Sequence, residues 1–227
     1  MQADQAAGLR SKHSRPRPQV VSLFSVQASL ATRLSCALQT PSCRVLLIDH
    51  AGRHSLATKT QSIFGWEQQV ARLRLQTISV DGIDILHAPG AQAGDAAIVQ
   101  AGKDYDYVLF DGQNVQPGTV ALDHRTKQML IIEVSALPDA VCNVYALLKT
   151  LHENKLKWRV ILWGDPALCE RLVSALHYFK RASSGLVEIV DVEADAHLTS
   201  LAARISAAEK GASPFHPNIG GESAQHG

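Results

Sequence analysis

Two aspartates at the ends of apolar runs are the residues whose type and spacing point to chemistry. Asp49 closes the run VLLID at 45–49, and Asp111 closes the run YVLFD at 107–111. A short apolar run that stops at an acid is typical of a buried parallel strand, which delivers a carboxylate to the ligand-binding edge of an α/β sheet. Two carboxylates at one edge would suit a magnesium ion and a phosphate group.

The partner that such a site needs is a glycine-rich loop carrying a lysine, placed after the first strand. Glycines let several backbone N–H groups converge on one anion, and the lysine offsets the charge of the β and γ phosphates. The first predicted strand covers 19–24, and the sequence that follows it reads SVQASLATRL, without glycine or lysine. The sequence therefore lacks the ordinary phosphate loop.

Length and composition indicate a single α/β domain with an ample core. The chain has 227 residues, 46% of them hydrophobic, and its 22 Lys and Arg nearly balance its 21 Asp and Glu. Such a balance gives no reason to expect a nucleic acid partner. No run of about 18 apolar residues predicts a membrane-spanning helix, and the start of the sequence has no apolar signal core, which favours the cytoplasm.

Strand-like and helix-like patterns alternate along the chain. The alternation predicts a three-layer α/β/α domain over 19–210, with a mainly parallel central sheet of about seven strands. Residues 1–18, which are basic, and 211–227 are predicted to be disordered tails. The predicted strands are 19–24, 44–49, 83–86, 105–110, 129–134, 158–163 and 186–190. The predicted helices are 28–38, two short helices within 52–75, 91–101, one starting at Pro138, 167–180 and 197–210.

The order of these motifs resembles the MinD/ParA family of deviant P-loop ATPases, a SIMIBI-class group. In that family a loop of the form KGGVGKTT follows the first strand, and later strands read roughly VLLIDxDPQG and YDYVLIDTP. Here the later two read VLLIDHAGRHSL and DYDYVLFDG. The segments ISVDGIDILHAPG and MLIIEVSALPDAVCNVYALLKTL are similar too, so the likeness covers about residues 19–180. It implies a P-loop NTPase-like fold.

The family's nucleotide residues are largely replaced in this sequence. Aligning Ser29 with the end of the family's loop puts Gln27 at the phosphate-binding lysine and Ala28 at the magnesium-binding hydroxyl. If no residues are deleted, Ser22 falls at the family's signature lysine. The Walker A loop of this chain is therefore interpreted as degenerate.

The second and third strand motifs each keep one aspartate, but the neighbouring residues that the family uses are replaced. Asp49 remains, but Ala51 takes the place of the second acid; Asp111 remains, but Gly112 replaces the usual threonine. Trp163 stands where the family usually has an asparagine that reads adenine. Phosphoryl transfer depends almost wholly on positioning and electrostatics. These losses together predict a pseudo-ATPase with no catalytic residue, no cofactor and no metal.

The resemblance implies a role in positioning protein assemblies. Members of this superfamily serve bacterial secretion, pilus, flagellar and cellulose-synthesis machines at membranes or cell poles. The hypothesis is therefore a non-catalytic scaffold, cytoplasmic or held at a membrane through its partners. It would work as a homodimer, or as a heterodimer with an active relative, through the former nucleotide edge. Phe24, Val26 and Trp163 are the candidate interface residues there.

Two alternatives remain open from the sequence. One is a weak or atypical nucleotide binder that uses Asp49 and Asp111 for magnesium. The other is a receiver-like signalling domain, because YDYVLFDGQNVQPG resembles a receiver's phosphoacceptor strand. Against the second, the proline lies one position too far from Asp111, and the strand VILWGDP lacks the expected lysine.

Histidines and cysteines suggest no separate site. His50 and His54 follow Asp49, but they form no HxH or HExxH pattern, so they are interpreted as loop or surface histidines. No CxxC pair occurs, which makes a zinc site improbable. The four cysteines are predicted to be buried thiols: Cys36, Cys43, Cys142 and Cys169.

Overall fold

The structure is a computed structural model that describes residues 17–54, 65–71, 77–92, 96–113, 115, 120, 128–154, 158–179, 187–191 and 196–209. The predicted tails lie outside the described residues except at 17 and 18. The strands are β1 Gln19–Phe24, β2 Val45–Asp49, β3 Ile78–Val80, β4 Ile83–His87, β5 Tyr107–Gly112, β6 Gln128–Val134, β7 Arg159–Gly164 and β8 Val187–Asp191. The helices are α2 Ala28–Leu38, α3 Trp66–Ala71, α4 Ala96–Ala101, α5 Pro138–Glu153, α6 Pro166–Phe179 and α7 Ala196–Glu209.

The strands form one eight-stranded sheet in the order β3-β4-β2-β5-β1-β6-β7-β8. Every pairing is parallel except that of β3 with β4. The seven predicted strands are all present, and β3 is the one that the sequence analysis missed. Asp81 and Gly82 both have positive φ, 51° and 81°, and join β3 to β4 as a two-residue hairpin turn.

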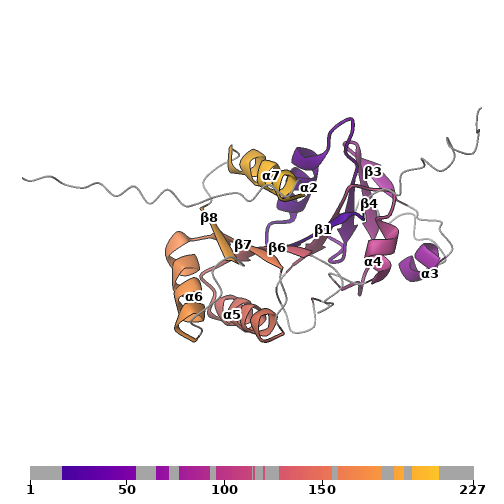
Figure 1. The fold of residues 1–227 in the computed structure, drawn as a ribbon. Coiled ribbons are helices and arrows are strands. Elements are labelled where there is room, and N and C mark those ends of the chain that lie inside the picture. Colours follow the sequence, from indigo (N-terminus) through magenta and orange to yellow (C-terminus); the bar gives the residue numbers. More distant parts are fainter. Residues whose placement is uncertain are drawn as a thin grey trace, which may run out of the picture.

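Helices cover both faces of the sheet, so the predicted three layers are confirmed (Figure 1). On one face α2 and α7 pack on the sheet through Leu30, Leu34, Leu201 and Ile205. On the other face α3, α4, α5 and α6 pack through a second apolar cluster that includes Trp66, Ile98, Leu148 and Leu172. The apolar strands are buried on both sides because each separates these two cores.

Helix boundaries follow the sequence closely where a capping or breaking residue marks them. Proline stands at the first position of α5 and of α6, where a backbone N–H would have no hydrogen-bond acceptor within the helix, so its absence costs nothing. Helix α4 is shorter than the predicted 91–101, because Ala91 bonds back to the Ala88 carbonyl in a turn. Of the two short helices predicted within 52–75, α3 is one; the other falls outside the described residues.

The prediction of four buried thiols is wrong for two cysteines. Cys36 and Cys142 are exposed, Cys43 is half-buried, and Cys169 is buried. The helical periodicity of α2 and α5 turns Cys36 and Cys142 away from the sheet, although their sequence neighbours are apolar.

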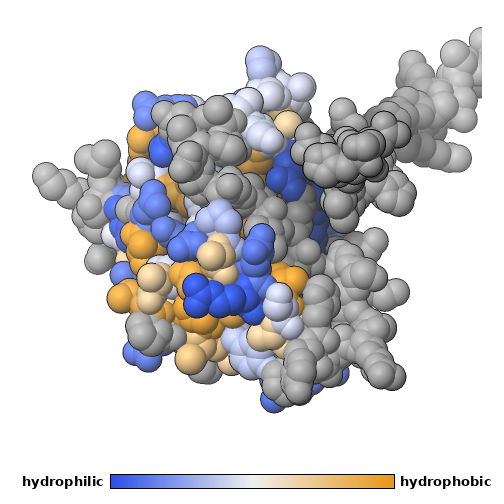
Figure 2. Space-filling view, turned by 90° about the vertical axis from the view of Figure 1, so that its left-hand side faces the viewer, coloured by the Kyte–Doolittle hydropathy of each residue, from blue (hydrophilic) through white to orange (hydrophobic). Residues whose placement is uncertain are grey.

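No helix among the described residues is both long and apolar enough to cross a membrane. Figure 2 shows the side of the molecule on which α6 and β8 lie. Hydrophobic residues gather in the lower part of this face, at the height of α5 and α6, and hydrophilic residues interrupt them.

Candidate functional site

The carboxyl ends of the central strands bring the two aspartates together. Asp49 pairs in register with Asp111 across β2 and β5, and with His87 across β2 and β4. Both aspartates are fully buried. Two buried carboxylates side by side are unfavourable unless cations or hydrogen-bond donors compensate them, so their partners define the site.

Arg53 is the main partner of Asp111. Its guanidinium forms an ion pair with the Asp111 carboxylate and donates to the carbonyl oxygens of Ser25, at 2.7 Å, and Gly112, at 3.3 Å. The Arg53 side chain is only 13% exposed. One arginine thus ties the loop after β2 to the ends of β5 and β1.

Asp49 holds the loop that carries Arg53. Its carboxylate accepts the backbone N–H of Arg53 at 3.0 Å and that of His54 at 3.4 Å. Gly52, with φ +68°, makes the turn that directs these two N–H groups back toward the strand end. Asp49 therefore has a structural task, which is to set the position of the arginine.

His54 also contacts Asp111, which the interpretation as a loop or surface histidine did not anticipate. Its Nε2 lies 2.9 Å from Asp111 Oδ2, and its Nδ1 lies 3.3 Å from the Thr32 hydroxyl. His87 approaches Asp49 at 3.5 Å. His50 instead packs beside the ring of Phe110, with ring centroids 5.3 Å apart.

Asp49, His54 and Asp111 could together hold a metal ion. One ligand atom from each lies within 4.8 Å of the others. The donor set fits a divalent cation, but Arg53 already neutralises Asp111, so a cation would have to compete with the guanidinium.

Glu133 occupies the turn after β1, where the phosphate loop would lie. Its Oε2 accepts from the Ser25 hydroxyl at 2.5 Å and from the Val26 backbone N–H at 3.0 Å. Its Oε1 accepts from the Gln27 side-chain amide at 3.0 Å. The turn 25–27 is therefore closed around a carboxylate that belongs to the neighbouring strand β6.

The other candidate residues scatter around this edge. Ala28 begins α2, Ser29 is exposed on that helix, and Ala51 is half-buried in the loop after β2. Among the hydrogen bonds described, none involves the Ser29 hydroxyl.

The candidate interface of Phe24, Val26 and Trp163 needs a correction. Phe24 is 2% exposed and Trp163 4%, because Trp163 packs into the α2 and α7 core and Phe24 into the opposite one. Neither side chain is exposed on the surface, although Phe24 lines the pocket described below. Val26, 54% exposed, is the one of the three that is.

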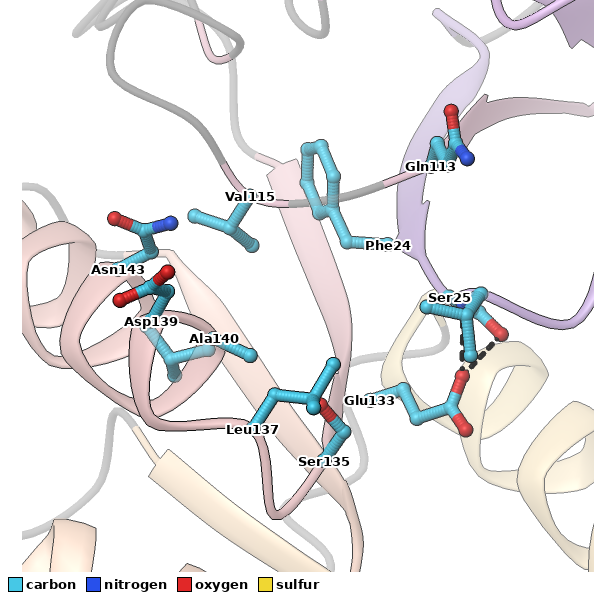
Figure 3. Close-up of a pocket in the computed structure, with 12 residues that line it drawn as sticks. Phe24, Ser25, Gln113, Val115, Glu133, Ser135, Leu137, Asp139, Ala140 and Asn143 are labelled. Atoms are coloured by element: carbon cyan, nitrogen blue, oxygen red, sulfur yellow. Dashed lines mark hydrogen bonds between the residues drawn. The ribbon is translucent and has the colours of Figure 1, made fainter.

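A pocket of about 320 Å³ opens next to the turn 25–27. Figure 3 shows Phe24 and Ser25 from the β1 side facing Leu137, Asp139 and Ala140 from the start of α5, with Glu133 below the turn. It lies on the side of β1 away from Asp49 and Asp111, so the edge carries two separate arrangements.

Comparison with solved structures identifies the fold. A plasmid partition protein from Borrelia burgdorferi is similar over 86% of this chain and 99% of its own, with 13% identity and a TM-score of 0.51. The chain has a P-loop NTPase-like fold. A chain of the MinC:MinD cell division protein complex from Aquifex aeolicus is also similar, at 15% identity over 85% of this chain and 89% of its own, with a TM-score of 0.47.

A ParA from pNOB8, solved on nonspecific DNA, is similar at 16% identity over 78% of this chain and 86% of its own, with a TM-score of 0.47. No family model and no curated protein sequence matches the chain.

Within the P-loop NTPase-like fold, Arg53 and Glu133 are the residues that sequence reasoning missed. A signal for each was present. Glu133 is the one charged residue in the apolar run QMLIIEV, and Arg53 follows Asp49 by four residues. Buried acids require a compensating cation, and an acid inside a buried strand requires donors.

Proposed function

We propose that this chain is a non-catalytic MinD/ParA-like pseudo-ATPase. It acts as a scaffold, regulatory or localisation subunit of a bacterial membrane-associated or polar machine, such as a secretion, pilus, flagellar or cellulose-synthesis assembly. It engages protein partners, as a homodimer or as a heterodimer with an active relative, at the edge where the parallel strands end.

The observation that carries the proposal is the position of Glu133. A phosphate loop binds an anion with free backbone N–H groups. In this chain the Val26 N–H is already donated to the Glu133 carboxylate, together with the Ser25 hydroxyl. The same carboxylate would repel a phosphate group placed in the turn. An internal anion thus takes the role of the ligand.

Arg53 supports the same conclusion from the other side of β1. Its guanidinium neutralises Asp111, the acid that remains from the family motif YDYVLIDTP. Magnesium bound there would have to displace the guanidinium from Asp111 and leave the largely buried Arg53 without its carboxylate. The edge is therefore electrostatically satisfied without Mg²⁺ and nucleotide.

Thermal unfolding of the whole chain with and without millimolar Mg-ATP or Mg-ADP tests the proposal. A ligand that binds the native state must raise its stability by mass action, by about 2.7 kcal/mol at 100 times Kd. We expect an unchanged unfolding temperature. A rise that Asp49→Ala or Asp111→Ala abolishes, but that Glu67→Ala at an exposed position of α3 preserves, would refute the pseudo-ATPase.

Light scattering over a range of concentrations tests whether nucleotide controls the oligomeric state of the proposed scaffold. A nucleotide-switched protein changes its oligomeric state with ligand, whereas this chain should give the same mass with and without Mg-ATP. A mass that doubles only in Mg-ATP would contradict the proposal.

One observation favours a second candidate function, a weak or atypical nucleotide binder. The grouping of Asp49, His54 and Asp111 could accept a divalent cation. This candidate requires an unfolding temperature that rises only when nucleotide and Mg²⁺ are both present. The receiver-like alternative has no such support, because the Asp111 carboxylate is buried and already bonded to Arg53 and His54.

A further inference from the structure

The pocket beside the turn 25–27 is lined by six apolar and six polar residues, and the apolar ones form a continuous part of its wall with the core. Its walls include Phe24, Val115, Leu137, Ala140 and Val144, and its volume is about 320 Å³. Phe24, Val115 and Val144 belong to the core on the side of α5, so the pocket opens directly onto packed side chains. A cavity of this volume lies at the small end of the range for ligand pockets, which fits a side chain better than a nucleotide.

Exposed apolar side chains border this pocket on both sides. Among the described residues, Val26 and Leu137 are the large hydrophobics that stand exposed, at 54% and 64%. Both line the pocket, Val26 from the turn after β1 and Leu137 from the residue before α5. Exposed hydrophobics gathered at one concavity mark an interaction site more often than singly scattered ones do.

The charge at the pocket is negative. Glu133 and Asp139 line it, and none of its described lining residues is basic. Asp139 lies in the first turn of α5, where it offsets the positive end of the helix dipole. An anionic ligand such as a phosphate would be repelled, and a lysine or arginine next to an apolar group would be attracted.

We propose that this pocket receives an apolar side chain of a protein partner, in a segment that carries a lysine or arginine beside it. The apolar side chain enters between Val26 and Leu137, and the basic side chain pairs with Asp139 at the rim. The inference rests on the proposed function, because it names the partner chemistry that the scaffold would recognise at this edge.

Selection of displayed random heptapeptides on the immobilised full chain, with counter-selection on the Leu137→Asp variant, tests the proposal. We expect enriched peptides to combine one large apolar residue with a neighbouring lysine or arginine. Synthetic peptides from that set should bind at least about tenfold more weakly to Leu137→Asp or Val26→Asp, as loss of a central apolar contact predicts. Versions with the basic residue changed to glutamine should also bind more weakly.

Matched variants separate recognition from folding. Asp139→Asn should weaken the basic peptides severalfold and reduce the salt dependence of their binding, whereas Glu153→Gln at the far end of α5 should not. Leu137→Ser, with the unfolding temperature measured alongside, serves as a milder replacement should Leu137→Asp fail to fold.

Three results would overturn the proposal. One is no enrichment above the Leu137→Asp background. Another is enrichment of acidic or uncharged peptides that Asp139→Asn does not affect. The third is a dimer of this chain that Leu137→Asp abolishes and that excludes the peptides, since the occupant would then be a second copy. A Mg-ATP shift in unfolding temperature refutes the pseudo-ATPase and leaves the peptide result to be judged separately.

Discussion

Arg53 reaches from the loop after β2 to the buried carboxylate of Asp111 on β5, and the two form an ion pair at the edge of the sheet. The aspartate has no access to solvent, and the arginine has little. The pair is held from both ends, because Asp49 fixes the backbone of Arg53 and β5 fixes Asp111. The pair matters for stability mainly because removal of one member leaves the other as an uncompensated buried charge.

Arg53→Ala should therefore destabilise the protein strongly. It leaves the Asp111 charge buried with His54 as its remaining side-chain partner, and it removes the bonds to the Ser25 and Gly112 carbonyls. We expect a loss of about 3–5 kcal/mol in the free energy of unfolding, measured with urea. Arg171→Ala, at an exposed position of α6, is the control and should change it by about 0.5 kcal/mol or less. Equal effects for both would show that the pair contributes nothing.

Glu133→Gln should loosen the turn 25–27. Glutamine keeps the shape but offers one neutral oxygen in place of a carboxylate that accepts three hydrogen bonds. We expect a loss of about 1–3 kcal/mol and faster hydrogen exchange of the Val26 amide. Glu153→Gln, at an exposed position, provides the comparison. Unchanged exchange at Val26 would mean that the carboxylate does not hold the turn.

Gly112→Ala should destabilise the end of β5 by steric conflict. A Cβ at this position would lie 2.6 Å from the ring of Phe24, so the buried ring would have to shift. Overpacking of this kind costs about 1–3 kcal/mol. Gly65→Ala is the matched control, since a Cβ there meets nothing within 4 Å.

Combining Gly112→Ala with Phe24→Leu should recover part of the stability lost in Gly112→Ala alone. If the double variant loses as much free energy of unfolding as the two single variants together, or more, the strain does not come from the contact between the added Cβ at position 112 and the ring of Phe24.

Tyr105 should make stability fall in alkaline solution. Burial, together with the hydrogen bond that its hydroxyl donates to Asp84 at 2.9 Å, raises its pKa to about 12. Between its ordinary value near 10 and about 12, the unfolded chain loses this proton while the folded chain keeps it. The stabilisation is complete below pH about 10 and is lost as pH rises toward about 12.

The measurement is urea unfolding across that pH range, compared with Tyr105→Phe, which should show a shallower decline. Tyrosinate absorbance of the folded protein should also lose a component that titrates at about pH 12 in Tyr105→Phe. Identical pH profiles for the two proteins would contradict the assignment.

Sequence reasoning located the sheet and its carboxylates because buried parallel strands leave a continuous apolar signature that ends at a polar residue. It failed at β3, where three residues with little burial gave no such run, although the Asp81–Gly82 dipeptide indicated a hairpin. At the site, the partners of Asp111 come from 57 and 58 residues away in sequence. Contacts of that separation depend on the packed fold and leave no local pattern.

The candidate interface shows the same limit. Periodicity cannot distinguish an aromatic residue that faces a groove from one that faces a core when both stand at a strand end. Phe24 and Trp163 turned out to be buried, and Val26 exposed, because the chain leaves the sheet at Ser25.

The carboxylate of Glu133 in the turn 25–27 also bears on how the shape of this turn is regulated. A bound nucleotide fills such a turn according to its concentration in the cell, and hydrolysis empties it again. A side chain on the neighbouring strand is always present, does not dissociate on dilution and is not consumed. In the pseudo-ATPase that we propose, the shape of this turn is therefore set when the chain folds, and the amount of the protein, rather than the cell's energy supply, would decide how many such surfaces exist.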